Sequence, residues 1–183
     1  MVYKNKKIIL KNGKECFLRS PNVVDAEKLL EYLKQTSSET DYMLRYPEEI
    51  TMSIIDEENF LKTVSESPNS VMISAFIDNR LVGNASFKCV GDMIKLSHRA
   101  TFGIAIIKEA WNLGIGTALL TEIFDCAKKV GIEQLELEVV STNYKAISLY
   151  EQFEFERYGL RDNAFKLKDG SYCAEHLMMK KIK

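Results

Sequence analysis

The sequence has few residues of the kinds that mark metal sites, linkers or nucleic-acid binding. Its two histidines and four cysteines are scattered without metal-ligand spacing, and three prolines leave no candidate for an interdomain linker. The net charge is −1, so no basic excess points to nucleic acid. No apolar run approaches the length of a membrane span, and no N-terminal segment has the order of a signal peptide. We therefore expect a cytoplasmic protein with no metal, nucleic-acid or membrane partner.

The rest of the composition is that of an ordinary soluble domain. The chain has 183 residues, of which 46% are apolar and 28% are charged. This length suffices to bury a proper core, and internal repeats and low-complexity segments are absent. Residues 1–183 are expected to form a single domain with reduced thiols.

Periodicity and turn signals predict the order of secondary structure. Asn12-Gly13 is a hairpin signal, and Asn22 is expected to cap a helix with Asp25 at its third position and Val24 on its apolar face. The predicted strands cover 8–10, 15–19, 71–77, 81–90, 98–107 and 134–140, with a last hairpin around Asp169-Gly170. Further helices are expected over 56–64, from Thr117 onwards and over 145–152. A right-handed crossover should make the strands at 98–107 and 134–140 parallel neighbours in a mixed sheet.

The strand at 98–107 leads into a loop with two glycines, Gly114 and Gly116, and then into an amphipathic helix. Backbone amides at a helix start are unpaired, and the helix macrodipole favours negative charge there. Because glycine has no Cβ, the backbone of 112–117 could close on a phosphate. No Gly-Lys-Ser/Thr follows, which excludes a Walker loop, and a dinucleotide fingerprint would need glycine at Leu119. The two glycines alone are equally compatible with a structural turn.

A second motif follows the strand at 134–140. It runs from Asn143 to Phe155, and the glycine loop before it reads WNLGIG from Trp111 to Gly116. In this order the two motifs resemble R/Q-x-x-G-x-G/A and N-x-x-A-x-x-L-Y-x-x-x-G-F of the GCN5-related N-acetyltransferase (GNAT) superfamily. Trp111 replaces the usual Arg or Gln, and Glu154 replaces the usual Gly, which implies a differently built turn there.

The resemblance implies a fold, a cofactor and a reaction. The fold is single-domain α/β, a mixed, mostly antiparallel twisted sheet with one parallel strand pair splayed around the cofactor and about four helices. The reaction is transfer of acetyl from acetyl-coenzyme A to a primary amine, by direct attack in a ternary complex. The acceptor is a small-molecule amine or a protein N-terminus, and a homodimer is left open. The alternative is a catalytically silent coenzyme A-binding sensor or scaffold.

The same resemblance assigns the cofactor mainly to backbone groups. The pantetheine arm is expected along the strand as an added strand would lie, with an amide near Ile106 facing the thioester oxygen. The pyrophosphate is expected on the glycine loop, and Asn143 is expected to contact pantetheine or to cap the following helix. The predicted cofactor-binding residues are Ile104, Ala105, Ile106, Asn112, Leu113, Gly114, Ile115, Gly116, Thr117 and Asn143.

Tyr150 and Glu138 are the predicted catalytic residues, in a spacing with Asn143 that resembles the ribosomal-protein alanine N-acetyltransferases. An unperturbed phenol has a pKa of about 10 and a thiol about 8.5, so Tyr150 can protonate the departing sulfur; otherwise it is a packing residue. An amine is mostly ammonium at pH 7, and Glu138 could take its proton. Glu136 on the same strand face leaves open that Glu138 is simply solvated.

Acids and aromatic residues also gather where the superfamily places its acceptor-binding loop. They suit a cationic amine, and they are equally compatible with a solvated loop. These residues are Glu39, Asp41, Tyr42, Arg45, Tyr46, Glu48 and Glu49.

Overall fold

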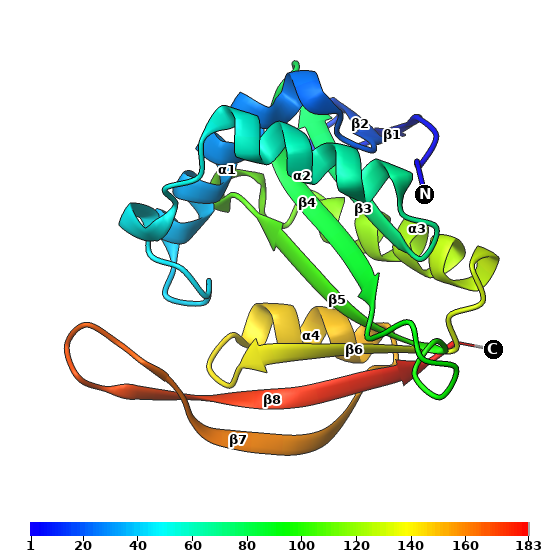
Figure 1. Cartoon of the computed structure of the whole chain (residues 1–183). Helices are drawn as coiled ribbons and strands as arrows, with labels where there is room; N and C mark the ends of the chain where they lie inside the picture. Colours follow the sequence, from blue (N-terminus) through cyan, green and yellow to red (C-terminus); the bar gives the residue numbers. More distant parts are fainter. Residues whose placement is uncertain (183) are drawn as a thin grey trace.

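The computed structural model describes residues 1–182. Eight strands form one sheet in the order β1-β2-β3-β4-β5-β6-β8-β7 (Figure 1). The strands are β1 (Lys6–Ile9), β2 (Glu15–Arg19), β3 (Ser70–Ile77), β4 (Arg80–Cys89), β5 (Arg99–Ile106), β6 (Gln134–Val140), β7 (Glu156–Lys166) and β8 (Tyr172–Lys181). The helices are α1 (Ala26–Glu39), α2 (Ile54–Glu66), α3 (Ile115–Lys129) and α4 (Tyr144–Gln152), with 3-10 turns at Val23–Asp25, Pro47–Glu49 and Lys108–Ala110.

The predicted fold class is confirmed. All neighbouring strands pair antiparallel except β5 and β6, which are parallel as the crossover through α3 predicted. Helices α1 and α2 lie on one face of the sheet and α3 and α4 on the other (Figure 1). Leu119, Ile123 and Ala127, one turn apart on α3, are fully buried, which is the apolar face that the spacing indicated.

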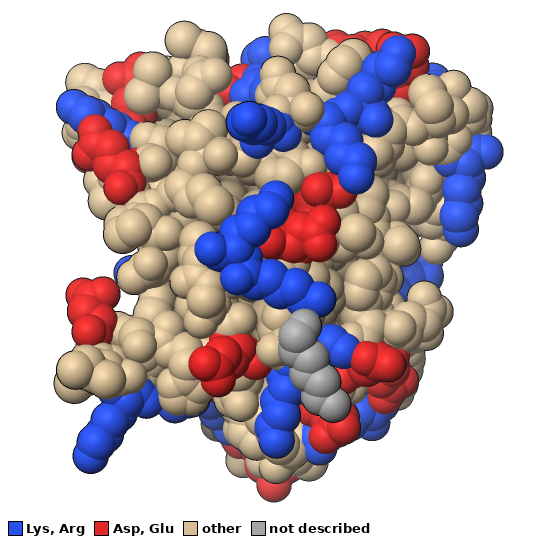
Figure 2. Space-filling model, turned by 90° about the vertical axis from the view of Figure 1, so that its right-hand side faces the viewer, with Lys and Arg blue, Asp and Glu red and all other residues tan. Residues whose placement is uncertain are grey.

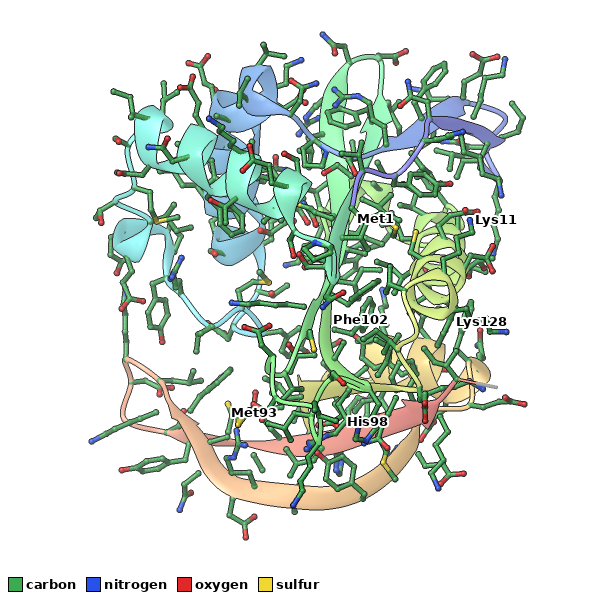
Figure 3. All side chains as sticks on the ribbon, turned by 45° about the vertical axis from the view of Figure 1, so that its right-hand side comes forward. Met1, Lys11, Met93, His98, Phe102 and Lys128 are labelled. Carbon is green, nitrogen blue, oxygen red and sulfur yellow. The ribbon has the colours of Figure 1, made fainter. Side chains whose placement is uncertain are left out.

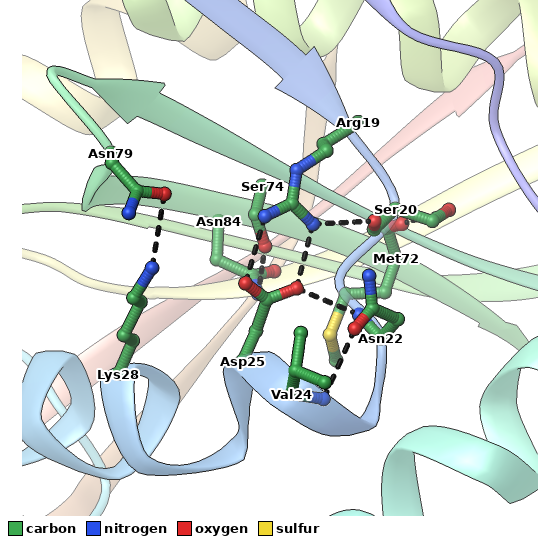
Figure 4. Close-up of polar contacts among 10 residues, drawn as sticks. All are labelled: Arg19, Ser20, Asn22, Val24, Asp25, Lys28, Met72, Ser74, Asn79 and Asn84. Carbon is green, nitrogen blue, oxygen red and sulfur yellow. Dashed lines mark hydrogen bonds and ion pairs between the residues drawn. The ribbon is translucent and has the colours of Figure 1, made fainter.

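The turn before α1 is built by local side-chain hydrogen bonds. The Asn22 side chain accepts from the Val24 amide at 3.0 Å, and the Asp25 carboxylate accepts from the Asn22 amide at 2.9 Å. Arg19 donates to both oxygens of Asp25, at 2.6 and 2.7 Å (Figure 4). The cap is therefore confirmed, but the prediction of Val24 on the apolar face is wrong. Val24 is 80% exposed because it lies in the 3-10 turn, two residues before α1 begins at Ala26.

The turn after α4 corrects another expectation. Glu154 adopts φ +61°, a left-handed conformation that favours glycine, and the Phe155 amide donates to the Tyr150 carbonyl at 3.0 Å. The turn therefore keeps the left-handed geometry in which a glycine would be at ease. The departure from glycine is absorbed as backbone strain, not by a differently built turn.

The described surface carries charges of both signs. Figure 2 shows Lys and Arg interspersed with Asp and Glu on one face, in keeping with the net charge of −1. Within residues 1–182, no helix is long and apolar enough to cross a membrane, and no cluster of His, Cys, Asp and Glu could hold a metal ion. All four cysteines are free, and Cys16 and Cys126 are buried.

Candidate active site

The parallel strands β5 and β6 stay together for only part of their length. They pair from Arg99 to Thr101 on β5 with Gln134 to Glu136 on β6, and the sheet splays apart beyond. The splay opens a cleft of about 650 Å³, a size typical of ligand sites. Phe102 lies at the branch point, inside the molecule between the sheet and the helices (Figure 3). The cleft is lined by the end of β5, the glycine loop, the start of α3, the end of β6, α4 and the end of α1.

This cleft brings together all but one of the predicted site residues. Both catalytic candidates and nine of the ten cofactor candidates line it. Leu113 is the exception, because its carbonyl turns away to accept the Lys11 amide of the β1–β2 turn at 3.1 Å. Lys11 itself lines the cleft, although no sequence pattern had indicated it.

The edge of β5 supplies free backbone groups. The Ile107 amide donates to Val82 and the Val90 amide to Arg99, each at 3.0 Å, so the odd-numbered residues of β5 bond to β4. The backbone groups of Ile104 and Ile106 consequently point into the cleft. Ala105 does not offer its backbone there, and its carbonyl also accepts the Tyr32 hydroxyl at 2.6 Å. Of the three predicted strand residues, Ile104 and Ile106 alone have the orientation that an added strand requires.

Trp111 fixes one of these groups. Its indole Nε1 donates to the Ile106 carbonyl at 2.6 Å, so of the two Ile106 backbone groups the carbonyl is already engaged. The Lys145 ammonium lies 4.7 Å from the centre of the Trp111 ring and lines the cleft. The tryptophan in the motif position of Arg or Gln therefore orders a carbonyl and places a cation, two roles that the sequence did not reveal.

The start of α3 is open to an anion. No side chain caps it, its first turn has no acidic residue, and no hydrogen bond from the amides of Ile115, Gly116 and Thr117 is found within residues 1–182. Such unpaired amides fit a phosphate group. A pyrophosphate-bearing cofactor thus suits the residues present.

Glycine is present at the two positions of the loop for different physical reasons. Gly114 has φ +95°, and a Cβ there would meet no atom within 4 Å. A Cβ on Gly116 would lie 2.9 Å from Cδ2 of Leu149 on α4. Gly116 therefore permits close packing of α3 on α4, whereas Gly114 permits a left-handed helix start. The expectation that both glycines let the backbone approach a phosphate stays a prediction, and the packing against Leu149 is a second reason for Gly116.

Tyr150 is a buried residue in the last turn of α4. It is 6% exposed and meets Phe102 edge to face, with ring centres 6.2 Å apart. Burial raises the pKa of its phenol, so the hydroxyl stays protonated near neutral pH. No hydrogen bond of this hydroxyl is found within residues 1–182, and Tyr150 is one of the residues that line the cleft. Asn143 caps α4, accepting from the Ala146 amide at 3.3 Å, and also lines the cleft.

Glu138 belongs to a cluster of three charges. Arg161 on β7 donates to both Glu138 oxygens, at 2.7 and 2.8 Å, and to Glu175 on β8 at 3.2 Å. Glu138 and Glu175 both line the cleft. The acidic face of β6 is therefore ion-paired, and its neighbour Glu136 is 9% exposed and bound by Arg99, with one contact of 2.7 Å.

The loop after α1 borders the same cleft. Thr40, Tyr42 and Met43 line it, and the Tyr42 hydroxyl donates to the Thr142 carbonyl at 3.4 Å. Farther along, the Lys168 amide at the β7–β8 hairpin donates to the Tyr46 hydroxyl at 3.1 Å. The loop thus contacts both the turn after β6 and the last hairpin, so it is part of the cleft wall and not only a solvated loop.

Comparison with known proteins identifies the family. The model of the acetyltransferase (GNAT) family matches residues 27–155. The L-amino acid N-acetyltransferase AaaT of Escherichia coli is 28% identical, over 63% of this chain and 70% of that protein. The [ribosomal protein bS18]-alanine N-acetyltransferase of Escherichia coli is 35% identical, but over 42% of this chain and 52% of that protein.

Solved structures agree. An acetyltransferase of the GNAT family from Streptococcus pneumoniae superposes with a TM-score of 0.86 at 27% identity, covering 92% of this chain and 99% of that chain. The structure of yncA from Salmonella typhimurium, with its cofactor acetyl-CoA, shares the fold with a TM-score of 0.80 at 14% identity, covering 92% and 94%. The chain belongs to the acetyltransferase (GNAT) family and is an acyltransferase that takes its acetyl group from acetyl-coenzyme A.

Proposed function

We propose that this chain transfers acetyl from acetyl-coenzyme A to a primary α-amine, by direct attack in a ternary complex. One observation carries the proposal: a single cleft is lined by the uncapped start of α3, the free edge of β5, Tyr150, Glu138 and Glu175, and Arg161 binds both of these carboxylates. The first two features suit a phosphate and an amide-rich arm, Tyr150 suits a proton donor, and the two carboxylates suit a cationic acceptor. None of the four cysteines lines the cleft, which favours direct attack over an acetyl-cysteine.

The donor half is formed mostly by main chain. The amides of Ile115 to Thr117 would hold the pyrophosphate, and Ile104 and Ile106 would pair with the pantetheine amides. Asn143 and Lys145 line the same part of the cleft. The bound cofactor would supply a thioester, whose acyl carbon is open to a nucleophile. Tyr150 would hold the proton that the leaving sulfur needs.

The acceptor half is negative. Two carboxylates share one guanidinium there, which leaves an excess negative charge that attracts an ammonium group. The relatives are named for an L-amino acid, a ribosomal-protein alanine and N-alpha acetylation, all of which are α-amine acceptors. An α-amine has a pKa of about 8 and needs less help to lose its proton than a lysine-like amine.

The single-domain organisation and the cytoplasmic location are also part of the proposal. A single sheet from Lys6 to Lys181 supports one domain. Four free cysteines support a reducing compartment such as the cytoplasm.

The test is release of free thiol from acetyl-coenzyme A against a panel of amines. The panel contains free amino acids, short peptides with a free N-terminus, a polyamine and an N-acetylated peptide as control. We expect thiol release with α-amines and none with the blocked peptide. Calorimetric binding of coenzyme A without thiol release for any amine would contradict the proposal and favour a silent binding module.

A further inference from the structure

Glu175 lies in the acceptor half of the cleft, although no sequence motif contains it. On β8 it is paired with Val140 of β6 on one side and Arg161 of β7 on the other. Directly opposed residues of antiparallel strands project to the same face, and so do alternate residues of one strand. Glu175 therefore projects to the same face as Arg161 and Glu138, and it lines the cleft while only 5% exposed.

The two carboxylates differ in what they still have to offer. Both oxygens of Glu138 already accept charge-assisted hydrogen bonds from Arg161, and its side chain is 51% exposed. Glu175 receives one longer contact, from Arg161 to Oε2 at 3.2 Å. No hydrogen bond to Oε1 of Glu175 is found within residues 1–182. This oxygen is also not one of the fully buried side-chain atoms that lack a hydrogen-bond partner, so it is accessible from the cleft. Glu175 thus has the carboxylate oxygen that is free to accept a proton.

We propose that Glu175 is the general base that deprotonates the acceptor amine, and that Glu138 is a positioning residue that holds Arg161. The proposal rests on the proposed function. The ammonium nitrogen gives one proton to Oε1 of Glu175, which passes it to water. The nitrogen then bonds to the acetyl carbon as the carbon–sulfur bond breaks, and the sulfur takes the Tyr150 proton. A second nitrogen proton, carried by water, restores Tyr150, so that one proton is released in total.

The surroundings of Glu175 suit a base that works near neutral pH. Burial, together with the negative charge of Glu138, raises the pKa of the Glu175 carboxyl against the opposing effect of Arg161. Arg161 and Glu138 are the charged groups that face it from β7 and β6. Glu39 also lines the cleft, from α1, but its carboxylate accepts the Lys108 amide at 2.7 Å. His176, the next residue on β8, projects to the opposite face.

The experiment compares the pH dependence of kcat/KM for the acceptor in Glu175→Gln, Glu138→Gln and a control, Glu156→Gln, an exposed residue of β7 outside the cleft. In Glu175→Gln we expect kcat at pH 7 to fall roughly 10²-fold or more. Its acidic limb should move to the pKa of the free α-amine, about 8. In Glu138→Gln the acidic limb should persist and move to lower pH. The pKa of Glu175 falls there because its negative neighbour is gone and Arg161 no longer pairs with a second carboxylate. Glu156→Gln should keep the native profile.

The opposite pattern would overturn the proposal: a limb lost in Glu138→Gln and merely shifted in Glu175→Gln makes Glu138 the base. An unchanged profile in Glu175→Gln would overturn it too. Coenzyme A affinity within a few-fold of native in both variants would show that each is folded. A carboxyl ¹³C titration of glutamate-labelled protein adds a readout without turnover. It should show two glutamates with a raised pKa, Glu57 and Glu175, of which one is missing in Glu175→Gln and both remain in Glu138→Gln. No acetyl transfer by the unmodified chain would refute the proposed function, and this assignment with it.

Discussion

Gly116 allows a direct test of why the glycine loop has its sequence. It occupies the second position of α3, and a Cβ there would lie 2.9 Å from Cδ2 of Leu149 and 3.5 Å from Cδ1 of Ile106. Since ordinary contacts of a Cβ begin at 3.4 Å, the Leu149 methyl has to move by about 0.5 Å in Gly116→Ala. The Cβ points at α4, not into open solvent, so we expect the change to disturb packing more than cofactor binding.

The magnitude follows from two opposing terms. Overpacking costs about 1–3 kcal/mol, and the low end applies because Cδ2 ends a flexible side chain. Replacing glycine by alanine in a helix raises the free energy of unfolding by about 1 kcal/mol. Gly116→Ala should therefore lower the free energy of unfolding by no more than about 1 kcal/mol, a fall in Tm of about 2–4 °C. Combination with Leu149→Ala should remove the clash and show a favourable coupling of about 1 kcal/mol.

The assay is a double-mutant cycle by denaturant unfolding, with calorimetry of coenzyme A on each variant. Gly114→Ala is the matched control. An alanine at position 114 would be strained by φ +95°, but its Cβ would meet no atom within 4 Å. The loss of unfolding free energy in Gly114→Ala should therefore add to that of Leu149→Ala without coupling. Coenzyme A affinity in the Gly116→Ala, Leu149→Ala double variant should be within a few-fold of Leu149→Ala alone. A tenfold or larger loss in both Gly116→Ala proteins would refute this reasoning and show that the glycine serves the phosphate.

Three further substitutions test other parts of the account. Tyr150→Phe should lower turnover roughly 10²-fold or more while coenzyme A affinity stays within a few-fold; turnover at the native rate would make Tyr150 a packing residue. Trp111→Phe removes the indole N–H from the Ile106 carbonyl and should lower the free energy of unfolding by about 1 kcal/mol, and no change by denaturant unfolding would contradict the role of that bond. Burial raises the pKa of Glu57, whose Oε1 has no partner within residues 1–182. Because its folded pKa lies above the unfolded value, stability is lost as pH rises through the folded pKa, and Glu57→Gln should raise Tm at pH 7 but not at pH 4. An equal change at both pH values would count against that sign.

Local chemistry explains why most elements were predictable from the sequence. Asn12-Gly13 turns the first hairpin, the Asn22 side chain caps the segment before α1, and Gly131 ends α3 with φ +78°. Each of these residues determines the conformation of the backbone only a few residues away. The error at Val24 arose because a 3-10 turn precedes α1, which rotates that side chain into solvent.

The site was predictable where it depends on a single segment. The open start of α3 and the cap at Asn143 follow from their own neighbours, and they were found from the motifs. Side-chain contacts between distant segments were not predictable. Arg161 and Glu175 reach Glu138 through the strand order β6-β8-β7, which no spacing in the sequence encodes.

The measurement that tests the central claim most directly is the initial-rate pattern of acetyl transfer. Acetyl-coenzyme A and the best α-amine of the panel are varied together, and the intact mass of the protein is followed during turnover. Because the proposed donor and acceptor residues line one cleft and none of the four cysteines lines it, we predict intersecting double-reciprocal lines and no acetylated protein intermediate. Parallel lines, together with a protein that carries acetyl before the amine is added, would contradict direct transfer in a ternary complex.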